Sequence, residues 1–247
     1  MVPMHTTRDQ QQPVIAAIFD VDGVIVDSPH EQAWREALQG FADPQKFTTA
    51  IYQSHVAGKP RMSGARAALE QLGVPDAAAQ APAYAERKQK RLEELIAAER
   101  FSAFPDALRF IQAIRAHGIR LAAASSSKNA NQMMARVRLE SGACLLDMFD
   151  ANLSGRDVKR GKPDPELFLL AASELAVAPA ECLVVEDAPS GLEAAKAGGM
   201  VGLGVARVGD VGLLRAAGAN LVVTSLDDVA IEPLAAGRIS LRPIQKG

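Results

Sequence analysis

The stretch VIAAIFDVDG, residues 14–23, decides the fold because an uninterrupted apolar run ends abruptly in carboxylates. A short apolar run without alternation is typical of a strand that is buried on both faces, as in a parallel sheet. Asp20 and Asp22 would then stand at the carboxyl end of that strand, which is where ligands bind in open α/β sheets. Gly23 permits a tight turn directly after them.

Similar apolar runs predict further strands of the same sheet. Helix-like stretches at 165–175 and 190–198 separate the later runs. Strands and helices that alternate at this spacing predict an α/β protein whose core is a Rossmann-like, doubly wound parallel sheet. The additional strands are expected at residues 119–124, 182–185, 201–205 and 220–223.

Local side-chain chemistry predicts where several helices begin and end. The sequence SGLE at 190–193 has the form of a capping box, with a hydroxyl at the N-cap and a carboxylate three residues later. Asp164 before Pro165 predicts an N-cap carboxylate followed by proline in the first turn. Gly118 and Gly199 predict helix ends.

A different pattern fills the region after the first strand. Helical periodicity runs through 31–39, 63–72 and 81–98, with no convincing strand between them. A helical block inserted after the first strand of a sheet is most economically a separate domain. We therefore expect an all-α cap domain at 30–102, a core at 14–29 and 103–247, and a disordered lead-in at 1–13.

The composition is that of an ordinary soluble globular protein, with 48% hydrophobic residues, 23% charged residues and a net charge of −2. This balance predicts no nucleic-acid partner, and the apolar runs fall short of the roughly 20 residues that cross a membrane. Cys144 and Cys182 lie in apolar runs, which predicts buried reduced thiols. Without the apolar segment of a signal peptide, a cytoplasmic monomer is expected.

The carboxylate pair Asp20 and Asp22 is the strongest indication of chemistry. Like charges this close repel each other, so the arrangement is costly without a cation. Mg²⁺ suits it, because this ion binds a few carboxylates together with water and phosphate oxygens. Two solvated aspartates would be the ordinary interpretation of one such pair. A second pair, Glu186 and Asp187, follows another apolar run and makes the signal more specific.

The segment DVDGVIVDS, residues 20–28, resembles the first motif of the haloacid dehalogenase superfamily. The resemblance implies that Asp20 is the nucleophile that becomes an aspartyl-phosphate and that Asp22 is the general acid and base. The family's dehalogenases lack the second aspartate and its ATPases usually carry threonine there. Asp22 therefore favours the family's phosphatases and phosphomutases.

Further segments match the same family in order, so the resemblance covers essentially the whole chain. Ser125, at the end of LAAAS, is implied to hydrogen-bond a phosphoryl oxygen. Lys162, in RGKPDP, is implied to offset the charge of nucleophile and phosphate, where a surface lysine would be the ordinary interpretation. Glu186 and Asp187, in VVEDAPSGL, are implied to complete a Mg²⁺ site with both aspartates of the first motif, Asp20 and Asp22.

Within the superfamily the chain is similar to the β-phosphoglucomutase subgroup. His30 and Trp34 match its H-x-x-x-W, which implies that His30 gates proton transfer by Asp22. Arg61 and Lys88 stand where the subgroup's cap grips phosphate and contacts substrate. The sequence SSSKN at 125–129 implies a hold on the distal phosphate and the sugar through Ser127, Lys128 and Asn129.

Three departures weaken the match in the cap: a shorter linker before His30, Pro60 within the cap loop, and Gln89 in place of asparagine. A capping histidine, a core tryptophan and solvated cations therefore remain alternatives for the cap residues. The first hypothesis is β-phosphoglucomutase-type interconversion of sugar phosphates with Mg²⁺ as cofactor. A phosphatase of small phosphate monoesters, such as sugar phosphates or phosphoglycolate, is the alternative. A non-catalytic phosphosugar-binding protein is less consistent with an intact nucleophile.

Overall fold

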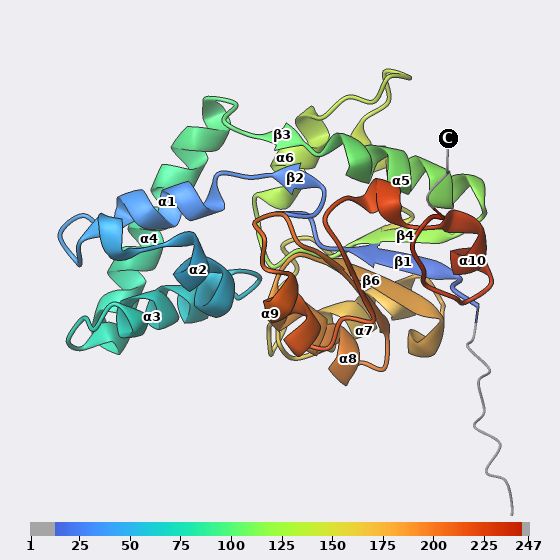
Figure 1. Ribbon diagram of the computed structural model, residues 1–247. Coiled ribbons are helices and arrows are strands. Elements are labelled where there is room, and N and C mark those ends of the chain that lie inside the picture. The colour runs from blue at the N-terminus through green and yellow to red at the C-terminus, as the bar shows by residue number, and fades with distance from the viewer. Residues whose placement is uncertain (1–12, 244–247) are drawn as a thin grey trace, which may run out of the picture.

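A six-stranded parallel sheet carries the core of the protein, which the computed structural model describes from residue 13 to residue 243 (Figure 1). The strand order is β5-β4-β1-β6-β7-β8, so the first strand lies in the middle of the sheet. Phe19 is in register with Ala123 of β4 and with Val185 of β6, which brings three strand ends together. The strands are β1 (Ala16–Phe19), β4 (Arg120–Ala123), β5 (Ala151–Asn152), β6 (Cys182–Glu186), β7 (Val201–Val205) and β8 (Leu221–Val223).

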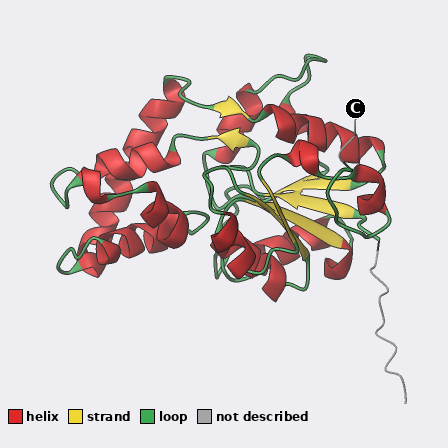
Figure 2. Cartoon of the chain, viewed as in Figure 1, coloured by secondary structure: helices red, strands yellow, loops and turns green. Residues whose placement is uncertain are grey.

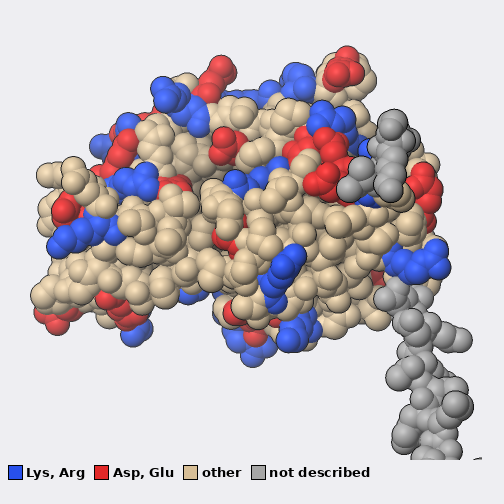
Figure 3. All heavy atoms as spheres, in the orientation of Figure 1, with Lys and Arg blue, Asp and Glu red and all other residues tan. Residues whose placement is uncertain are grey.

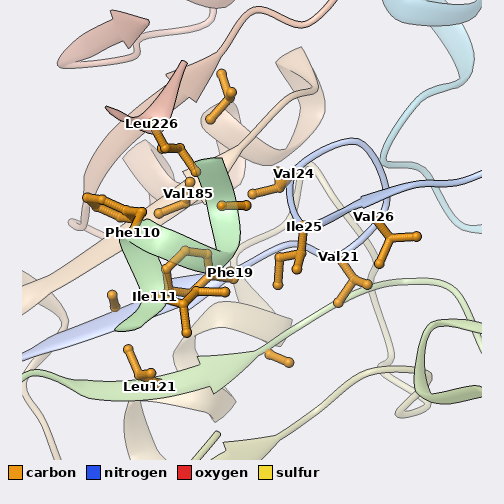
Figure 4. Close-up of a cluster of buried hydrophobic side chains, with 14 of the residues drawn as sticks. Phe19, Val21, Val24, Ile25, Val26, Phe110, Ile111, Leu121, Val185 and Leu226 are labelled. Carbon is orange, nitrogen blue, oxygen red and sulfur yellow. The ribbon is translucent and has the colours of Figure 1, made fainter. Parts of the chain in front are cut away.

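Alternate residues of each central strand enter two separate hydrophobic layers, which confirms the doubly covered sheet. In β1, Ala17 and Phe19 face one cluster of buried side chains, and Ala16 and Ile18 face the other. Figure 4 shows part of the first cluster, where Phe19 lies beside Phe110. The helices around the sheet are α5 (Pro105–Ala116), α6 (Ala130–Arg136), α7 (Glu166–Glu174), α8 (Pro189–Ala197), α9 (Val211–Ala216) and α10 (Ile231–Ala235), with short 3₁₀ helices η3 (Leu145–Met148), η4 (Pro179–Glu181) and η5 (Leu226–Asp228).

The segment from α1 to α4 forms a helical unit beside the sheet, consistent with an inserted cap (Figure 2). It has its own buried cluster, in which Tyr84 packs against Trp34 and Phe41. Two short antiparallel strands, β2 (Val26–Asp27) and β3 (Ser102–Ala103), connect it to the core. Its helical elements are α1 (His30–Ala37), η1 (Pro44–Lys46), α2 (Thr49–Ile51), a π-helical turn (Tyr52–Val56), α3 (Arg61–Gln71) and α4 (Ala77–Ala97).

Helix ends were predicted better than helix starts. Gly118 and Gly199 follow the ends of α5 and α8 with φ of 78° and 71°, as predicted. The capping box at Ser190 is wrong: α8 begins at Pro189, and the serine hydroxyl donates to Ala57 O at 3.0 Å. Asp164 does accept from the backbone N–H of Glu166 at 3.0 Å, although the helix begins one residue later than predicted.

Both cysteines are free thiols. Cys182 is buried, but Cys144 is partly exposed, so its predicted burial is wrong. The expected lead-in at 1–13 lies, apart from Pro13, outside the described residues. Within residues 13–243, each helix is too short or too polar to cross a membrane. Figure 3 shows acidic and basic side chains interspersed over the face in view.

Candidate active site

Three strand ends place the predicted core residues within one small region. Asp20 follows β1, Ser125 follows β4 by two residues, and Glu186 is the last residue of β6. Backbone hydrogen bonds continue the sheet past the strand ends: Asp20 N donates to Val185 O at 3.0 Å, and Ala124 N donates to Phe19 O at 2.8 Å. Side chains that are far apart in the sequence are therefore held rigidly beside one another.

Lys162 reaches this region from the loop before α7 and is completely buried. Its ammonium lies 2.6 Å from Asp20 Oδ1 and 2.6 Å from Glu186 Oε1, and it also donates to Ala124 O at 3.4 Å. Burial would lower the pKa of Lys162, but the two carboxylates raise it above its usual value. The lysine therefore stays charged and fixes the carboxylate of Asp20.

A cluster of three buried acids surrounds this lysine. One carboxylate oxygen each of Asp20, Glu186 and Asp187 lies within 4.8 Å of the other two. Burial raises the pKa of all three carboxyls, that of Glu186 to about 7, because their charged forms lose hydration. Such a set of hard oxygen donors fits a divalent cation. The carboxylate of Asp22 is not part of this cluster.

Glycines leave the room that the acid cluster needs. A Cβ on Gly23 would lie 1.9 Å from Asp187 Oδ2, and Gly23 has a φ of +83°, which L side chains rarely adopt. A Cβ on Gly191 would lie 1.8 Å from Glu186 Oε1. Both positions would displace a carboxylate if they carried a side chain. The close approach of backbone to acid is thus built into the site.

Asp22 points away from the acid cluster and toward the cap. Its Oδ2 accepts from Ser125 Oγ at 3.0 Å, and its Oδ1 lies 3.3 Å from His30 Nε2. Burial raises the pKa of Asp22, and burial beside Lys88 holds the pKa of His30 well below its usual value. A buried carboxyl with a raised pKa beside an imidazole with a lowered pKa is suited to acid and base chemistry.

On the cap side, His30, Lys88 and Trp34 form one contact group. Lys88 Nζ lies 3.0 Å from His30 Nδ1 and 4.8 Å from the centre of the Trp34 ring. Burial lowers the pKa of Lys88 to about 7. Trp34 is 4% exposed and packs against Tyr84, so it belongs to the cap core and also lines the cavity described next.

A cavity of about 400 Å³ lies between cap and core. Ser127 Oγ lies 3.3 Å from His30 Nε2, whereas Lys128 is paired with Asp157 at 2.9 Å. Lys162 and Glu186 do not line the cavity, although Lys162 contacts Asp20, which does. The other predicted site residues line it, namely Asp20, Asp22, His30, Trp34, Arg61, Lys88, Ser125, Ser127, Lys128, Asn129 and Asp187.

The cap loop at residues 57–60 contacts the core directly. Ser126 Oγ donates to Gly58 O at 3.2 Å, and a Cβ on Gly161 would lie 2.1 Å from Pro60 Cγ. Further out, Gln89 and Asn129 exchange side-chain amide hydrogen bonds of 3.2 and 3.4 Å. The structure therefore has the cap closed on the core.

Several wall residues were not predicted from the sequence. Tyr52 belongs to the π-helical turn, and Lys59, Arg156 and Lys159 bring further positive charge from loops. Lys59 was a visible signal, because it lies two residues before the predicted Arg61. Nothing in the local sequence distinguishes the other three from surface residues.

Comparison with known proteins identifies the family of this chain. The family model of haloacid dehalogenase-like hydrolases matches residues 15–199. The chain belongs to the haloacid dehalogenase-like hydrolase family. Its β-phosphoglucomutase-like character is also shown: the chain is 32% identical over 243 residues to a β-phosphoglucomutase from Mycobacterium bovis, covering 88% of this chain and 92% of the relative.

Other relatives of this haloacid dehalogenase-like protein include both mutases and phosphatases. The solved β-phosphoglucomutase from Pyrococcus sp. strain ST 04 superposes with a TM-score of 0.72 at 30% identity, covering 90% of this chain and 97% of that one. A phosphorylated carbohydrates phosphatase from Thermotoga maritima is 32% identical over 189 residues, covering 75% and 82%. The protein is thus an enzyme of the haloacid dehalogenase type, a phosphomutase or a phosphatase.

Proposed function

We propose that the protein is a Mg²⁺-dependent phosphomutase of the β-phosphoglucomutase type, which interconverts sugar phosphates through an aspartyl-phosphate at Asp20. One observation carries the proposal. Asp20 is held by Lys162 at a strand end, while Asp22 is held nearby by a core hydroxyl and lies 3.3 Å from a cap imidazole. A nucleophile and a separately held acid are what transfer through a covalent intermediate requires.

In the first half-reaction, a carboxylate oxygen of Asp20 bonds to phosphorus as the bond from phosphorus to the ester oxygen breaks. Asp22 gives its proton to the departing oxygen, and its raised pKa favours the protonated form. Lys162 offsets the negative charge on the nucleophile and the transferring group. Ser125, which bonds Asp22 here, is proposed to hold a phosphoryl oxygen as well.

The acid cluster is proposed to hold Mg²⁺ through the carboxylates of Asp20, Glu186 and Asp187, with Asp22 contributing its backbone carbonyl. The donor set fits this ion, because all donors are oxygens and Gly23 leaves room beside Asp187. When bound, the ion would neutralise charge on the phosphoryl oxygens. That contribution adds to the one from Lys162.

In the second half-reaction, Asp22 removes a proton from the acceptor that attacks the aspartyl-phosphate. The proposed cap, residues 30–102, closes over the proposed core, 14–29 and 103–247, and limits the access of water. His30 would gate this proton transfer. Arg61, Lys88, Ser127, Lys128 and Asn129 are proposed to hold the distal phosphate and the sugar, with Trp34 supporting His30 and Lys88. We propose that the enzyme acts as a cytoplasmic monomer.

The second candidate is a phosphatase of small phosphate monoesters. It is favoured by the exposure of Arg61 and by the pairing of Lys128 with Asp157, since neither cation is held in place for a distal phosphate. The similarity to the Thermotoga maritima phosphatase, at 32% identity, is consistent with it. Water would then be the acceptor.

Phosphorus NMR would decide between these functions. The protein would be incubated with β-glucose 1-phosphate, Mg²⁺ and a trace of glucose 1,6-bisphosphate. We expect glucose 6-phosphate; inorganic phosphate alone would reject the mutase in favour of the phosphatase. Tight sugar-phosphate binding without any turnover would indicate a non-catalytic binding protein. Asp20→Asn should abolish turnover, and full activity in this variant would refute the covalent mechanism.

A further inference from the structure

Arg207, in the loop between β7 and α9, lies outside the cavity but contacts residues that flank the two strands joining core and cap. We infer that Arg207 is a positioning residue, which holds the turn that carries Asp22 and so keeps the general acid in place. The inference rests on the proposed function, because it assigns Arg207 an effect on proton transfer by Asp22.

The guanidinium of Arg207 makes three kinds of contact with side chains and backbone that are distant in sequence. Its Nη2 donates to Val24 O at 3.1 Å, and its Nη1 donates to Asp106 Oδ2 at 2.8 Å. Its centre lies 4.0 Å from the centre of the Phe104 ring. With 13% of its side chain exposed, Arg207 is largely shielded from solvent. A planar guanidinium can satisfy all three partners at once, which an ammonium cannot.

Val24 belongs to the same tight turn as Asp22. The N–H groups of Ile25 and Val26 both donate to Val21 O at 2.9 Å, and Gly23 N donates to Val26 O at 2.8 Å. Figure 4 shows the side chains of Val21, Val24 and Ile25 around this turn, and all belong to the buried cluster of the core. The contact from Arg207 to Val24 O fixes the backbone two residues from Asp22.

The other contacts of Arg207 join this turn to the fixed part of the core. Phe104 directly follows β3, and its N–H donates to Ile25 O at 2.9 Å. Asp106 lies in the first turn of α5 and also accepts from Leu226 N at 2.8 Å and from Ser225 Oγ at 3.2 Å. Arg207 therefore holds the base of the β2–β3 connection. A cap that moves about this connection would leave the turn with Asp22 in place.

Loss of the contacts of Arg207 should slow phosphoryl transfer from an alkyl phosphate more than transfer from an aryl phosphate. An alkyl phosphate needs a proton on its leaving oxygen, whereas p-nitrophenolate leaves readily without one. General acid catalysis contributes about 10²- to 10⁴-fold, so a displaced acid should cost the alkyl ester about tenfold more than the aryl ester. A purely structural role for Arg207 predicts equal losses on both esters.

The test measures kcat and KM for p-nitrophenyl phosphate and glucose 6-phosphate, together with Tm, in matched variants. Arg207→Met should lower kcat/KM, which reports on the first half-reaction, about tenfold more for glucose 6-phosphate than for the aryl ester. Asp106→Asn keeps the contact to Val24 and should lower Tm without changing the ratio of the two kcat/KM values. Arg109→Met removes an exposed pair on the same helix, to Asp227, and should change neither.

Two further measurements keep the inference open to refutation if Arg207→Met folds poorly. Arg207→Lys retains a cation beside Asp106 and should have a Tm close to that of wild type while still changing the ratio of the two kcat/KM values. Amide hydrogen exchange at Ile25 and Val26 should accelerate in Arg207→Lys and not in Arg109→Met. An unchanged ratio or unchanged exchange in Arg207→Lys would overturn the inference alone. A wild-type protein that turns over neither ester would overturn the proposed function and the inference with it.

Discussion

Lys162→Met removes the cation that lies between the carboxylates of Asp20 and Glu186. Both N–O distances are 2.6 Å, and neither Lys162 nor Glu186 has any exposed side-chain surface. Methionine retains much of the volume but no charge and no donor. The substitution therefore leaves two buried acids without their partner, while the packing of the loop before α7 changes little.

The expected loss follows from the burial of this group. Removing one partner of a buried, hydrogen-bonded ion pair costs about 3–5 kcal/mol, because the remaining charge stays desolvated. A typical domain has about 5–15 kcal/mol of total stability. For a chain of this size each kcal/mol lowers Tm by about 2–4 °C, so Tm should fall by about 6–20 °C.

Unfolding would be followed by circular dichroism at pH 8 and at pH 5.5, with EDTA or with Mg²⁺. Without Lys162 the folded-state pKa values of the acids rise further above their unfolded values, so the folded state holds more protons than the unfolded state. Its free energy of unfolding then decreases as pH rises, and the deficit should be larger at pH 8 than at pH 5.5. Mg²⁺ at about 100 times its Kd should return about 2.7 kcal/mol.

Arg66→Met is the matched control, because Arg66 forms an exposed ion pair with Glu70 on α3 and its loss should leave Tm unchanged. A Lys162→Met protein that is as stable as wild type at pH 8 in EDTA would refute the reasoning. So would a deficit that grows as the pH is lowered, since that sign requires the folded variant to bind fewer protons than folded wild type.

Three further predictions concern the cavity and the acid cluster beside it. Lys88, with a pKa lowered to about 7, is mostly neutral at pH 8. Phosphate-ester binding should therefore take up a proton there, measured calorimetrically in two buffers, and Lys88→Met should lose this uptake; persistent uptake would contradict it. Gln89→Leu removes the amide pair across the closed cap and should raise KM about fivefold with little change in Tm; an unchanged KM would argue against a closing role. Gly23→Ala should weaken Mg²⁺ binding by displacing Asp187. Gly73→Ala, with a similar φ of +69° and no neighbour within 4 Å, should not.

The sheet could be predicted because each of its long strands carries a complete local signal. The run at 14–19 contains β1, and the run at 182–185 contains all but one residue of β6. Strand β5 was missed, since Ala151–Asn152 is too short to show a pattern and is defined by its pairing with β4. The predicted capping box failed for a related reason. Ser190 fits the local motif, but Ala57 O of the cap loop competes for its hydroxyl.

The same difference between local signals and long-range contacts separates the predictable part of the site from the rest. Residues at the ends of neighbouring parallel strands, such as Asp20 and Glu186, must lie close together once the sheet is known. The contacts of Arg207 join residue 207 to residues 24, 104 and 106, and no spacing in the sequence reveals them. Contacts across the cap, such as that between Lys88 and His30, likewise depend on how two folded parts meet.

The side chain of Asp22 lies between core and cap, so the proton transfer proposed for it depends on both. Ser125 fixes one of its oxygens from the core, whereas His30, at the start of α1, approaches the other from the cap side. An acceptor that spans the cavity can reach Arg61 on the cap side and Lys128 on the core side, and so can stabilise the closed arrangement in which this acid is complete. Water can make no such bridge, because it is too small to contact both. Hydrogen exchange in the 57–60 loop therefore distinguishes the two acceptors. If the acceptor is a sugar, a bridging phosphosugar should slow this exchange more than inorganic phosphate alone does.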